Sequence, residues 1–323
     1  MELVARQRLE LFTGRAHREL AEEIARCLGV SLGEANLREF ADGQIHCRYD
    51  ASIRGADVFI VQTHARPVND SVMEMLIMID AAKRASARRI TAVCPYYGYS
   101  RQDRKATGRE PITAKLLADL ITVAGADRVV SVDLHSGQIQ GFFDFPVDHL
   151  TAMPVLVEYL RQFDPRDLTV VSPDAGRVKV AERFSQRLGC DLAFVHKRRP
   201  PGAAGAVEAL EVIGNVEGRR CVVIDDMIDT AGTVCAAAER LVAEGAREVI
   251  AMATHPVLSG SALDRLKASP LARVVVTNTL PLPEERRIDK IEVLSVARII
   301  ADAIDAVFEG TSVSEIFGGQ NLS

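Results

Sequence analysis

The sequence contains no tryptophan, and only 5% of its residues are aromatic. Proteins that bind single-stranded nucleic acids stack the bases on aromatic side chains, so such platforms are scarce here. Basic residues are also in deficit, because 39 Lys and Arg stand against 44 Asp and Glu, for a formal net charge of -5. General nucleic-acid binders need a basic face to neutralise phosphates. We therefore expect no nucleic-acid partner.

Long apolar runs and paired cysteines are missing too. No stretch of about 18 consecutive apolar residues occurs, so no membrane-spanning helix and no membrane partner are expected. Residues 1–6 (MELVAR) lack the apolar segment of a secretory signal. The cysteines include no CxxC pair, so we expect buried thiols in a reducing compartment and predict the cytoplasm; they are Cys27, Cys47, Cys94, Cys190, Cys221 and Cys235.

What is present is the composition of a globular protein, with 323 residues of which 48% are hydrophobic and 26% charged. Short β-branched runs alternate with helical patterns. We predict strands at 57–62, 89–94, 220–224 and 248–253, helices at 69–85 and 230–244, and further units at 128 to the 150s and 168–196. This alternation predicts an α/β fold in which helices flank mainly parallel sheets.

Two strand–helix–strand units resemble each other in order and spacing. Each has a small residue and an arginine before its second strand, Ala87-Arg88 in one and Ala246-Arg247 in the other. Duplication explains the likeness, and chance similarity between such units explains it equally well. Pro146 and Pro154 flank a polar stretch, so we predict an N-terminal domain of residues 1–150 and a C-terminal domain of 151–323.

The strongest local motif is VVIDDMIDTAGT at 222–233, in which an apolar strand is followed by two carboxylates and a turn rich in small residues. Backbone N–H groups in such a turn, at the N-terminus of a helix, bind phosphate. Asp225 and Asp226 would accept hydrogen bonds from sugar hydroxyls beside it. In the alternative reading, Asp229 or Thr230 is a helix cap and the Asp pair is a solvated strand end.

This motif resembles the ribose-5-phosphate loop of the type I phosphoribosyltransferase fold. Further segments resemble the ribose-phosphate pyrophosphokinases, class I, in family order from about residue 36 to 317. They are FADG at 40–43, PYYGYSRQDRK at 95–105, REPITAK at 109–115, DLHSGQIQGFF at 133–143, SPD at 172–174, KRRP at 197–200 and THPVLSG at 254–260.

The resemblance implies two similar phosphoribosyltransferase-type domains, with the C-terminal tail packing back on the first. It implies a ribose-phosphate diphosphokinase, which moves the β,γ-diphosphoryl group of ATP to the 1-hydroxyl of ribose 5-phosphate and makes phosphoribosyl pyrophosphate (PRPP) and AMP for nucleotide, histidine and tryptophan biosynthesis. Mg²⁺ is the implied cofactor, and phosphate and ADP are the implied effectors. The implied assembly is a homohexamer built of dimers.

The resemblance also assigns roles to individual residues. His135 and Asp174 are the implied metal-side residues in an interdomain cleft, and Lys197 and Arg199, with His135, are the implied catalytic residues. The implied ribose 5-phosphate residues are Asp225, Asp226, Asp229, Thr230, Ala231, Gly232 and Thr233. The implied pyrophosphate loop is Asp174, Ala175, Gly176 and Arg177.

For ATP the resemblance implies Arg101 and Gln102 from one subunit, with Phe40, Asp42 and Gln44 from its neighbour. Three places depart from the family pattern, one of them Thr107-Gly108, in a stretch that is often richer in Arg and Ser. Gln44 stands where a glutamate is usual, and Arg177 stands where a second glycine is frequent. Tyr96, Tyr97 and Tyr99 are predicted to serve packing.

Two other functions remain open at this point. A nucleobase phosphoribosyltransferase would share the 225–233 loop, but it would not need a second α/β domain with Arg101, Gln102 and FADG. A non-catalytic regulatory subunit of the synthetase would not need His135, Asp174, Lys197 and Arg199.

Overall fold

The computed structural model describes residues 8–198 and 209–317. Of these, one compact unit (unit 1) contains the chain up to Thr151, Thr279–Pro281 and the chain from Ser295. The other (unit 2) contains Ala152–Asn278 and Leu282–Leu294. None of the helices in the described ranges is both long enough and apolar enough to cross a bilayer.

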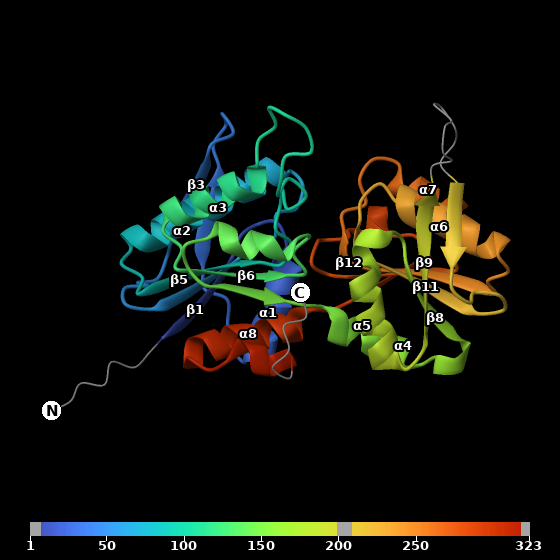
Figure 1. Ribbon diagram of the computed structural model, residues 1–323. Helices are drawn as coiled ribbons and strands as arrows, with labels where there is room; N and C mark the ends of the chain where they lie inside the picture. The colour runs from blue at the N-terminus through green and yellow to red at the C-terminus, as the bar shows by residue number, and fades with distance from the viewer. Residues whose placement is uncertain (1–7, 199–208, 318–323) are drawn as a thin grey trace. The chain divides into compact units, whose positions relative to one another are not determined.

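Unit 1 is built on a five-stranded parallel sheet in the order β1-β4-β5-β6-β7. The three central strands, β4, β5 and β6, are mostly apolar and buried, as expected for parallel strands with both faces covered. Helices α2 and α3 lie over one face, and α1 and α8 lie over the other (Figure 1). The elements are β1 Leu9–Thr13, α1 Arg18–Leu28, β2 Ala35–Glu39, β3 Ile45–Tyr49, β4 Asp57–Val61, α2 Val68–Arg84, β5 Arg89–Cys94, α3 Thr113–Ala124, β6 Arg128–Val132, β7 Val147–Leu150 and α8 Ala297–Glu309.

Unit 2 has a seven-stranded sheet in the order β10-β9-β8-β11-β12-β13-β14, parallel except for the β9–β10 pair. Helices α4 and α5 lie over one face, and α6 and α7 over the other (Figure 1). The elements are α4 Met153–Leu160, β8 Leu168–Ser172, α5 Val178–Leu188, β9 Asp191–Arg198, β10 Ala209–Ile213, β11 Arg220–Ile228, α6 Gly232–Ala243, β12 Glu248–Pro256, α7 Ala262–Ala268, β13 Arg273–Thr277 and β14 Ile291–Leu294.

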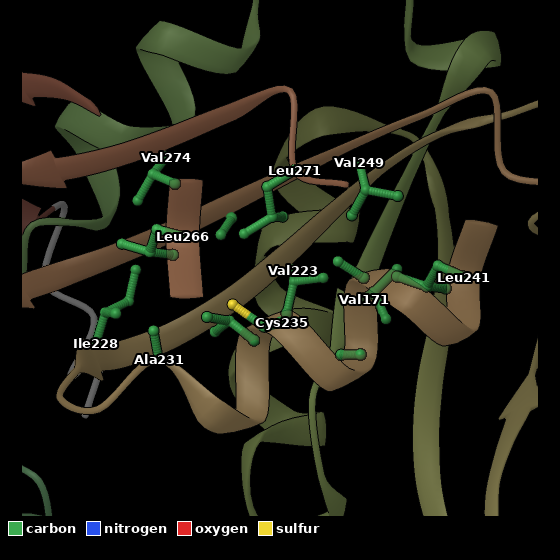
Figure 2. Packing of buried hydrophobic residues seen from close by; sticks show 14 of the residues in the cluster. Val171, Val223, Ile228, Ala231, Cys235, Leu241, Val249, Leu266, Leu271 and Val274 are labelled. Carbon is green, nitrogen blue, oxygen red and sulfur yellow. The ribbon is translucent and has the colours of Figure 1, made fainter. Parts of the chain in front are cut away.

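The core of unit 2 fixes the junction between β11 and α6. Ile228, at the end of the strand, and Ala231, before the helix, are both buried in the same apolar cluster (Figure 2). Cys235 and Leu241 continue this buried face along α6. The polar residues of the junction are therefore held by apolar neighbours on either side of them.

The two sheets repeat one topology. The order β8-β11-β12-β13-β14 matches β1-β4-β5-β6-β7 strand by strand. The register matches as well, because Arg220 pairs with Leu168 and Glu248 just as Asp57 pairs with Leu9 and Arg89. The predicted α/β fold with two similar domains is confirmed. In this register Gln62, which follows β4, corresponds to Asp225.

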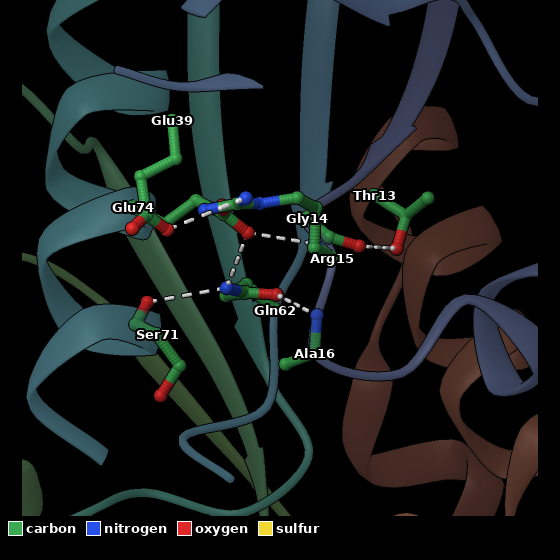
Figure 3. Close-up of polar contacts among 8 residues, drawn as sticks. All are labelled: Thr13, Gly14, Arg15, Ala16, Glu39, Gln62, Ser71 and Glu74. Atoms are coloured by element: carbon green, nitrogen blue, oxygen red, sulfur yellow. Dashed lines mark hydrogen bonds and ion pairs between the residues drawn. The ribbon is translucent and has the colours of Figure 1, made fainter. Parts of the chain in front are cut away.

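A buried polar network occupies that position in unit 1 (Figure 3). Glu74 of α2 is 2% exposed, and its Oε1 accepts hydrogen bonds from Gln62 Nε2 at 3.0 Å and from the backbone N–H of Arg15 at 2.6 Å. The Arg15 guanidinium pairs with the same carboxylate. A Cβ atom at Gly14 would lie only 2.2 Å from Gln62 Oε1. Side chains therefore fill the space beside Gly14.

Glu74→Ala is expected to destabilise unit 1 by about 1–3 kcal/mol, because it removes the carboxylate that accepts hydrogen bonds from the buried amide of Gln62 and from the backbone N–H of Arg15. Glu22→Ala is the matched control, since Glu22 makes an exposed ion pair with Arg18 on α1 that contributes at most about 1 kcal/mol. Urea unfolding of both variants measures the two losses. Equal losses would show that the buried network contributes no more than a surface pair.

The prediction that the cysteines are buried is correct for Cys94, Cys221 and Cys235. It holds only in part for Cys47 and Cys190, which are half-buried, and it is wrong for Cys27, which is exposed. Cys27 lies on α1 among alternating polar and apolar residues, and the face that packs into unit 1 is formed by Leu20, Ala21 and Ile24 instead. All six cysteines are free thiols, as predicted.

Candidate active site

The segment from Asp225 to Thr233 connects a buried strand to a helix N-terminus. β11 is predicted to end at Ile224, but it continues to Ile228, so Asp225 and Asp226 lie within the strand. The extension follows from pairing with β12, which continues to the Ile228–Pro256 pair after pairing with β8 has ended at Val223. Both carboxyl groups consequently sit on rigid backbone.

The turn that follows is braced by the residues just after β12. Ile228 O and Asp229 O accept hydrogen bonds from Leu258 N and Ser259 N, each at 2.8 Å, and the Ser259 hydroxyl donates to Asp229 Oδ1. Ala231 adopts a left-handed backbone (φ 62°), and no side chain caps the first turn of α6. Free N–H groups at such an N-terminus suit an anion. The bracing by Ser259 was not predicted from the motif.

The predicted pyrophosphate loop (Asp174–Arg177) follows β8. Asp174 caps it, because its Oδ1 accepts hydrogen bonds from Gly176 N at 2.8 Å and from Arg177 N at 3.1 Å. The Arg177 side chain leaves the loop and reaches the carboxyl groups of β11. Its Nη2 lies 2.5 Å from Asp226 Oδ2, and its Nε lies 3.5 Å from Asp225 Oδ1. The structure thus brings the predicted pyrophosphate and ribose segments together within unit 2.

These contacts change the acidity of Asp225. Burial, reinforced by the neighbouring Asp226 carboxyl, raises the pKa of Asp225 to about 8, while the Arg177 cation opposes the rise. The Asp225–Asp226 pair therefore holds a proton at neutral pH. The consequence is a site of low net charge, since Arg177 balances the remaining carboxylate.

This raised pKa predicts a pH dependence of stability. An unfolded aspartate has a pKa of about 3.9, so between about pH 4 and pH 8 the folded protein binds more protons at this site. Asp225 then lowers the free energy of unfolding as pH rises, by up to about 1.4 kcal/mol per pH unit. Asp225→Asn should remove this pH-dependent loss. The free energy of unfolding of the variant, measured in urea relative to wild type, should therefore increase from pH 5 to pH 8. A difference independent of pH would contradict the assignment.

The two predicted catalytic cations differ in what can be said of them. Lys197 is the second-last residue of β9, and its backbone pairs with Leu210 of β10. Arg199 lies outside the described residues. The antiparallel β9–β10 ladder thus fixes the backbone of Lys197 within the sheet of unit 2.

The predicted adenine residues lie at the tip of the β2–β3 hairpin in unit 1. Phe40 is 46% exposed, with the Arg38 guanidinium 5.2 Å from the centre of its ring. The Asp42 carboxylate accepts two hydrogen bonds from Gln44, one from its backbone N at 3.1 Å and one from Nε2 at 2.8 Å. An exposed ring beside an oriented carboxylate suits a nucleobase. At this tip Gln44 is a partner of Asp42, where a glutamate would repel it.

Arg101 and Gln102 lie after β5 at a cavity of about 460 Å³ in unit 1. Gly98, one of the lining residues, donates its backbone N–H at 2.8 Å to His64, which is fully buried. Burial lowers the pKa of His64 to about 4, so the ring is neutral. The lining residues are Val68, Tyr96, Gly98, Tyr99, Ser100, Arg101 and Gln102.

The tyrosine prediction holds for Tyr97, which is 2% exposed and donates to Ala114 O at 3.0 Å. Tyr96 and Tyr99 instead line the cavity. A position at the end of a strand suggested packing, but it does not distinguish a tyrosine in the core from one in the cavity wall. The cavity wall was therefore missed from the sequence.

His135 lies in unit 1, in the loop that follows β6. The loop begins with a left-handed Asp133 (φ 38°), and His149 Nε2 accepts a hydrogen bond from Leu134 N at 2.8 Å. Asp174 belongs to unit 2. Within residues 8–198 and 209–317 no group of three His, Cys, Asp or Glu side chains could hold a metal ion. The metal site that joins His135 and Asp174 therefore stays a prediction.

Two family models match this chain. Residues 9–125 match the N-terminal domain of ribose phosphate pyrophosphokinase, and residues 197–318 match the phosphoribosyl synthetase-associated domain. A curated protein from Streptomyces coelicolor named ribose-phosphate pyrophosphokinase is 56% identical over 315 residues, 97% of each chain. One of the same name from Bacillus cereus is 51% identical over 309 residues, 96% of this chain and 97% of that protein.

A solved structure agrees with these relatives. The crystal structure of phosphoribosylpyrophosphate synthetase from Mycobacterium smegmatis matches with a TM-score of 0.89 and 50% identity, over 94% of this chain and all of that one. Full-length similarity of this degree favours a synthetase over a nucleobase phosphoribosyltransferase. The chain belongs to the ribose-phosphate pyrophosphokinase family.

Proposed function

We propose that this enzyme transfers the β,γ-diphosphoryl group of ATP to the 1-hydroxyl of ribose 5-phosphate, with the sugar phosphate held by Asp225–Thr233. The observation that supports this assignment most is the pair of carboxyl groups on β11 beside the uncapped N-terminus of α6. Carboxyl groups bind the ribose hydroxyls, and the helix N-terminus binds the 5-phosphate. The 1-hydroxyl is then presented from a rigid platform.

The 1-hydroxyl of ribose 5-phosphate attacks the β-phosphorus of ATP, and AMP leaves. Both reactants are negatively charged, so catalysis depends mainly on aligning them and neutralising their charge. In this proposal Lys197 and Arg199 stabilise the charge on the transferring group. The pyrophosphate loop orients the diphosphate. Mg²⁺, if bound there, would supply Lewis-acid neutralisation of phosphate charge. Asp174 is exposed and its carboxylate is a suitable Mg²⁺ ligand, with His135 as its predicted companion.

An assay with ATP, Mg²⁺ and ribose 5-phosphate separates the candidate functions. The proposal predicts AMP and PRPP in equal amounts. A nucleobase phosphoribosyltransferase would instead consume added PRPP when a nucleobase is supplied. A chain that forms no product from either mixture would be the non-catalytic subunit, and both of these outcomes would contradict the proposal.

We further propose a homo-oligomer, with a hexamer as the expected size. α3 presents three exposed apolar side chains on one face, Leu116, Leu120 and Val123, which are 54%, 43% and 77% exposed. A contiguous exposed apolar stripe marks a protein–protein surface. The six free thiols fit the predicted cytoplasmic location. Phosphate and ADP remain the predicted effectors.

In such an oligomer Phe40 and Asp42 would serve the ATP site that contains Arg101 of a neighbouring subunit. Mixing inactive Asp42→Ala and Arg101→Ala chains after reversible dissociation tests this arrangement. Mixed oligomers should regain part of the wild-type activity, because some sites receive both intact residues. Verified mixed oligomers without recovered activity would contradict a shared site.

A further inference from the structure

One cation connects the pyrophosphate loop to the strand that carries the sugar-binding carboxyl groups. Arg177 ends the loop, and its guanidinium spans Asp225 and Asp226 at 3.5 and 2.5 Å. The side chains are 18% exposed for Arg177, 17% for Asp225 and 5% for Asp226. Solvent therefore screens these contacts much less than it screens a surface ion pair.

The backbone explains why Arg177 reaches β11. Asp174 accepts the N–H of Arg177 itself, which fixes the start of the side chain. β8 stops pairing with β11 at the Val171–Val223 pair, so the chain after β8 passes beside the part of β11 that carries the two carboxyl groups. The contact is therefore built by the sheet and by the loop cap together.

We propose that Arg177 is a positioning residue for ribose 5-phosphate, acting through Asp225 and Asp226. This inference rests on the proposed function of Asp225–Thr233. The guanidinium contacts one oxygen of each carboxyl group and so fixes the orientation of both. The carboxylate oxygens can still accept further hydrogen bonds from sugar hydroxyls. The cation also offsets negative charge in a site that must admit an anionic sugar phosphate.

The proposal gives the side chain of Arg177 a role separate from the diphosphate. ATP approaches the loop, but the guanidinium faces the carboxyl groups that the sugar needs. Loss of Arg177 should therefore act on ribose 5-phosphate much more than on ATP. A charged hydrogen bond of this kind corresponds to about a ten- to hundred-fold change in affinity.

The experiment measures the binding of ribose 5-phosphate and of ATP separately, by calorimetry on the full chain, for Arg177→Gln, Arg177→Lys and the control Arg187→Gln. The Arg187→Gln substitution removes one positive charge, as Arg177→Gln does, but from the exposed last turn of α5. We expect Arg177→Gln to weaken ribose 5-phosphate about ten- to hundred-fold and ATP less than about three-fold. Arg177→Lys should recover part of the loss, because it keeps the charge without the two-pronged geometry.

A second measurement tests whether the effect passes through the carboxyl groups. In an Asp226→Asn background, Arg177→Gln should cost clearly less than it costs in wild type, because residues in contact are not additive. Full additivity, an equal loss for both substrates, or an unchanged affinity for ribose 5-phosphate would each overturn the proposal. If Asp225→Asn with Asp226→Asn leaves ribose 5-phosphate binding unchanged, the proposed sugar site fails instead.

Discussion

Replacing Asp225 and Asp226 together by asparagine is expected to weaken ribose 5-phosphate binding by about a hundred-fold or more. Each carboxyl group is held on β11, and one charge-assisted hydrogen bond is worth about 1.5–3 kcal/mol. ATP should lose much less affinity, because its predicted adenine residues, Phe40 and Asp42, are in unit 1. Calorimetric titration with each substrate measures the two losses.

Asparagine keeps the size of aspartate, so the variant isolates charge and acceptor strength from packing. Asp264→Asn is a suitable control, since Asp264 is exposed on α7 within the same unit. An equal loss of affinity for both substrates would show that the β11 pair supports the fold of unit 2. The sugar assignment would then be wrong.

Lys197→Ala is expected to lower kcat by about 10²–10³ and to leave both KM values nearly unchanged. The expected loss in kcat is taken from other catalytic groups that stabilise developing charge. KM should stay nearly unchanged, because a contact made only in the transition state does not help substrate binding. Lys197 stands near the end of the β9–β10 ladder, next to the segment that contains Arg199. Steady-state kinetics beside direct ATP binding tests the prediction.

Two comparisons sharpen this test. Lys267→Ala removes an exposed lysine from α7 and should leave kcat and KM unchanged. Arg199→Ala should behave like Lys197→Ala, and the double variant should lose less than the sum if both cations act on one group. A large loss of ATP affinity with kcat intact would identify Lys197 as a ground-state anchor.

The fold was largely predictable because the local pattern of apolar and polar residues indicates where strands and helices alternate. The strand predicted at 89–94 is β5, and the helix predicted at 69–85 is α2 within one residue at either end. β11 was predicted four residues too short, because Asp225 and Asp226 interrupt its apolar run while pairing with β12 continues the strand to Ile228. The residue pattern of one segment does not show which strand will pair with it.

The site was predictable in its motifs and less so in its contacts. The family and the synthetase activity inferred from the motifs are confirmed by the full-length relatives. Arg177 was assigned to phosphate, but its side chain pairs with Asp225 and Asp226. Asp225 and Asp226 lie 48 and 49 positions after Arg177, and they meet it only because β8 and β11 are neighbours in the sheet.

The repeated topology also shows why only one half carries the proposed sugar site. Gln62 has the register position of Asp225, but it hydrogen-bonds to Glu74. Glu74, which is buried, in turn pairs with the partly exposed side chain of Arg15. A sequence likeness between the halves predicts the shared framework, whereas the side chains at one strand end decide which half can bind a sugar.

The most direct test of the account is ³¹P nuclear magnetic resonance of wild-type enzyme with ATP, Mg²⁺ and ribose 5-phosphate, with Asp225→Asn/Asp226→Asn in parallel. The account predicts that the diphosphoryl group moves intact, so signals of AMP and of a new sugar diphosphate grow together. In the variant they should grow far more slowly at low ribose 5-phosphate. Formation of ADP with a sugar bisphosphate, or equal rates for the two proteins, would contradict it.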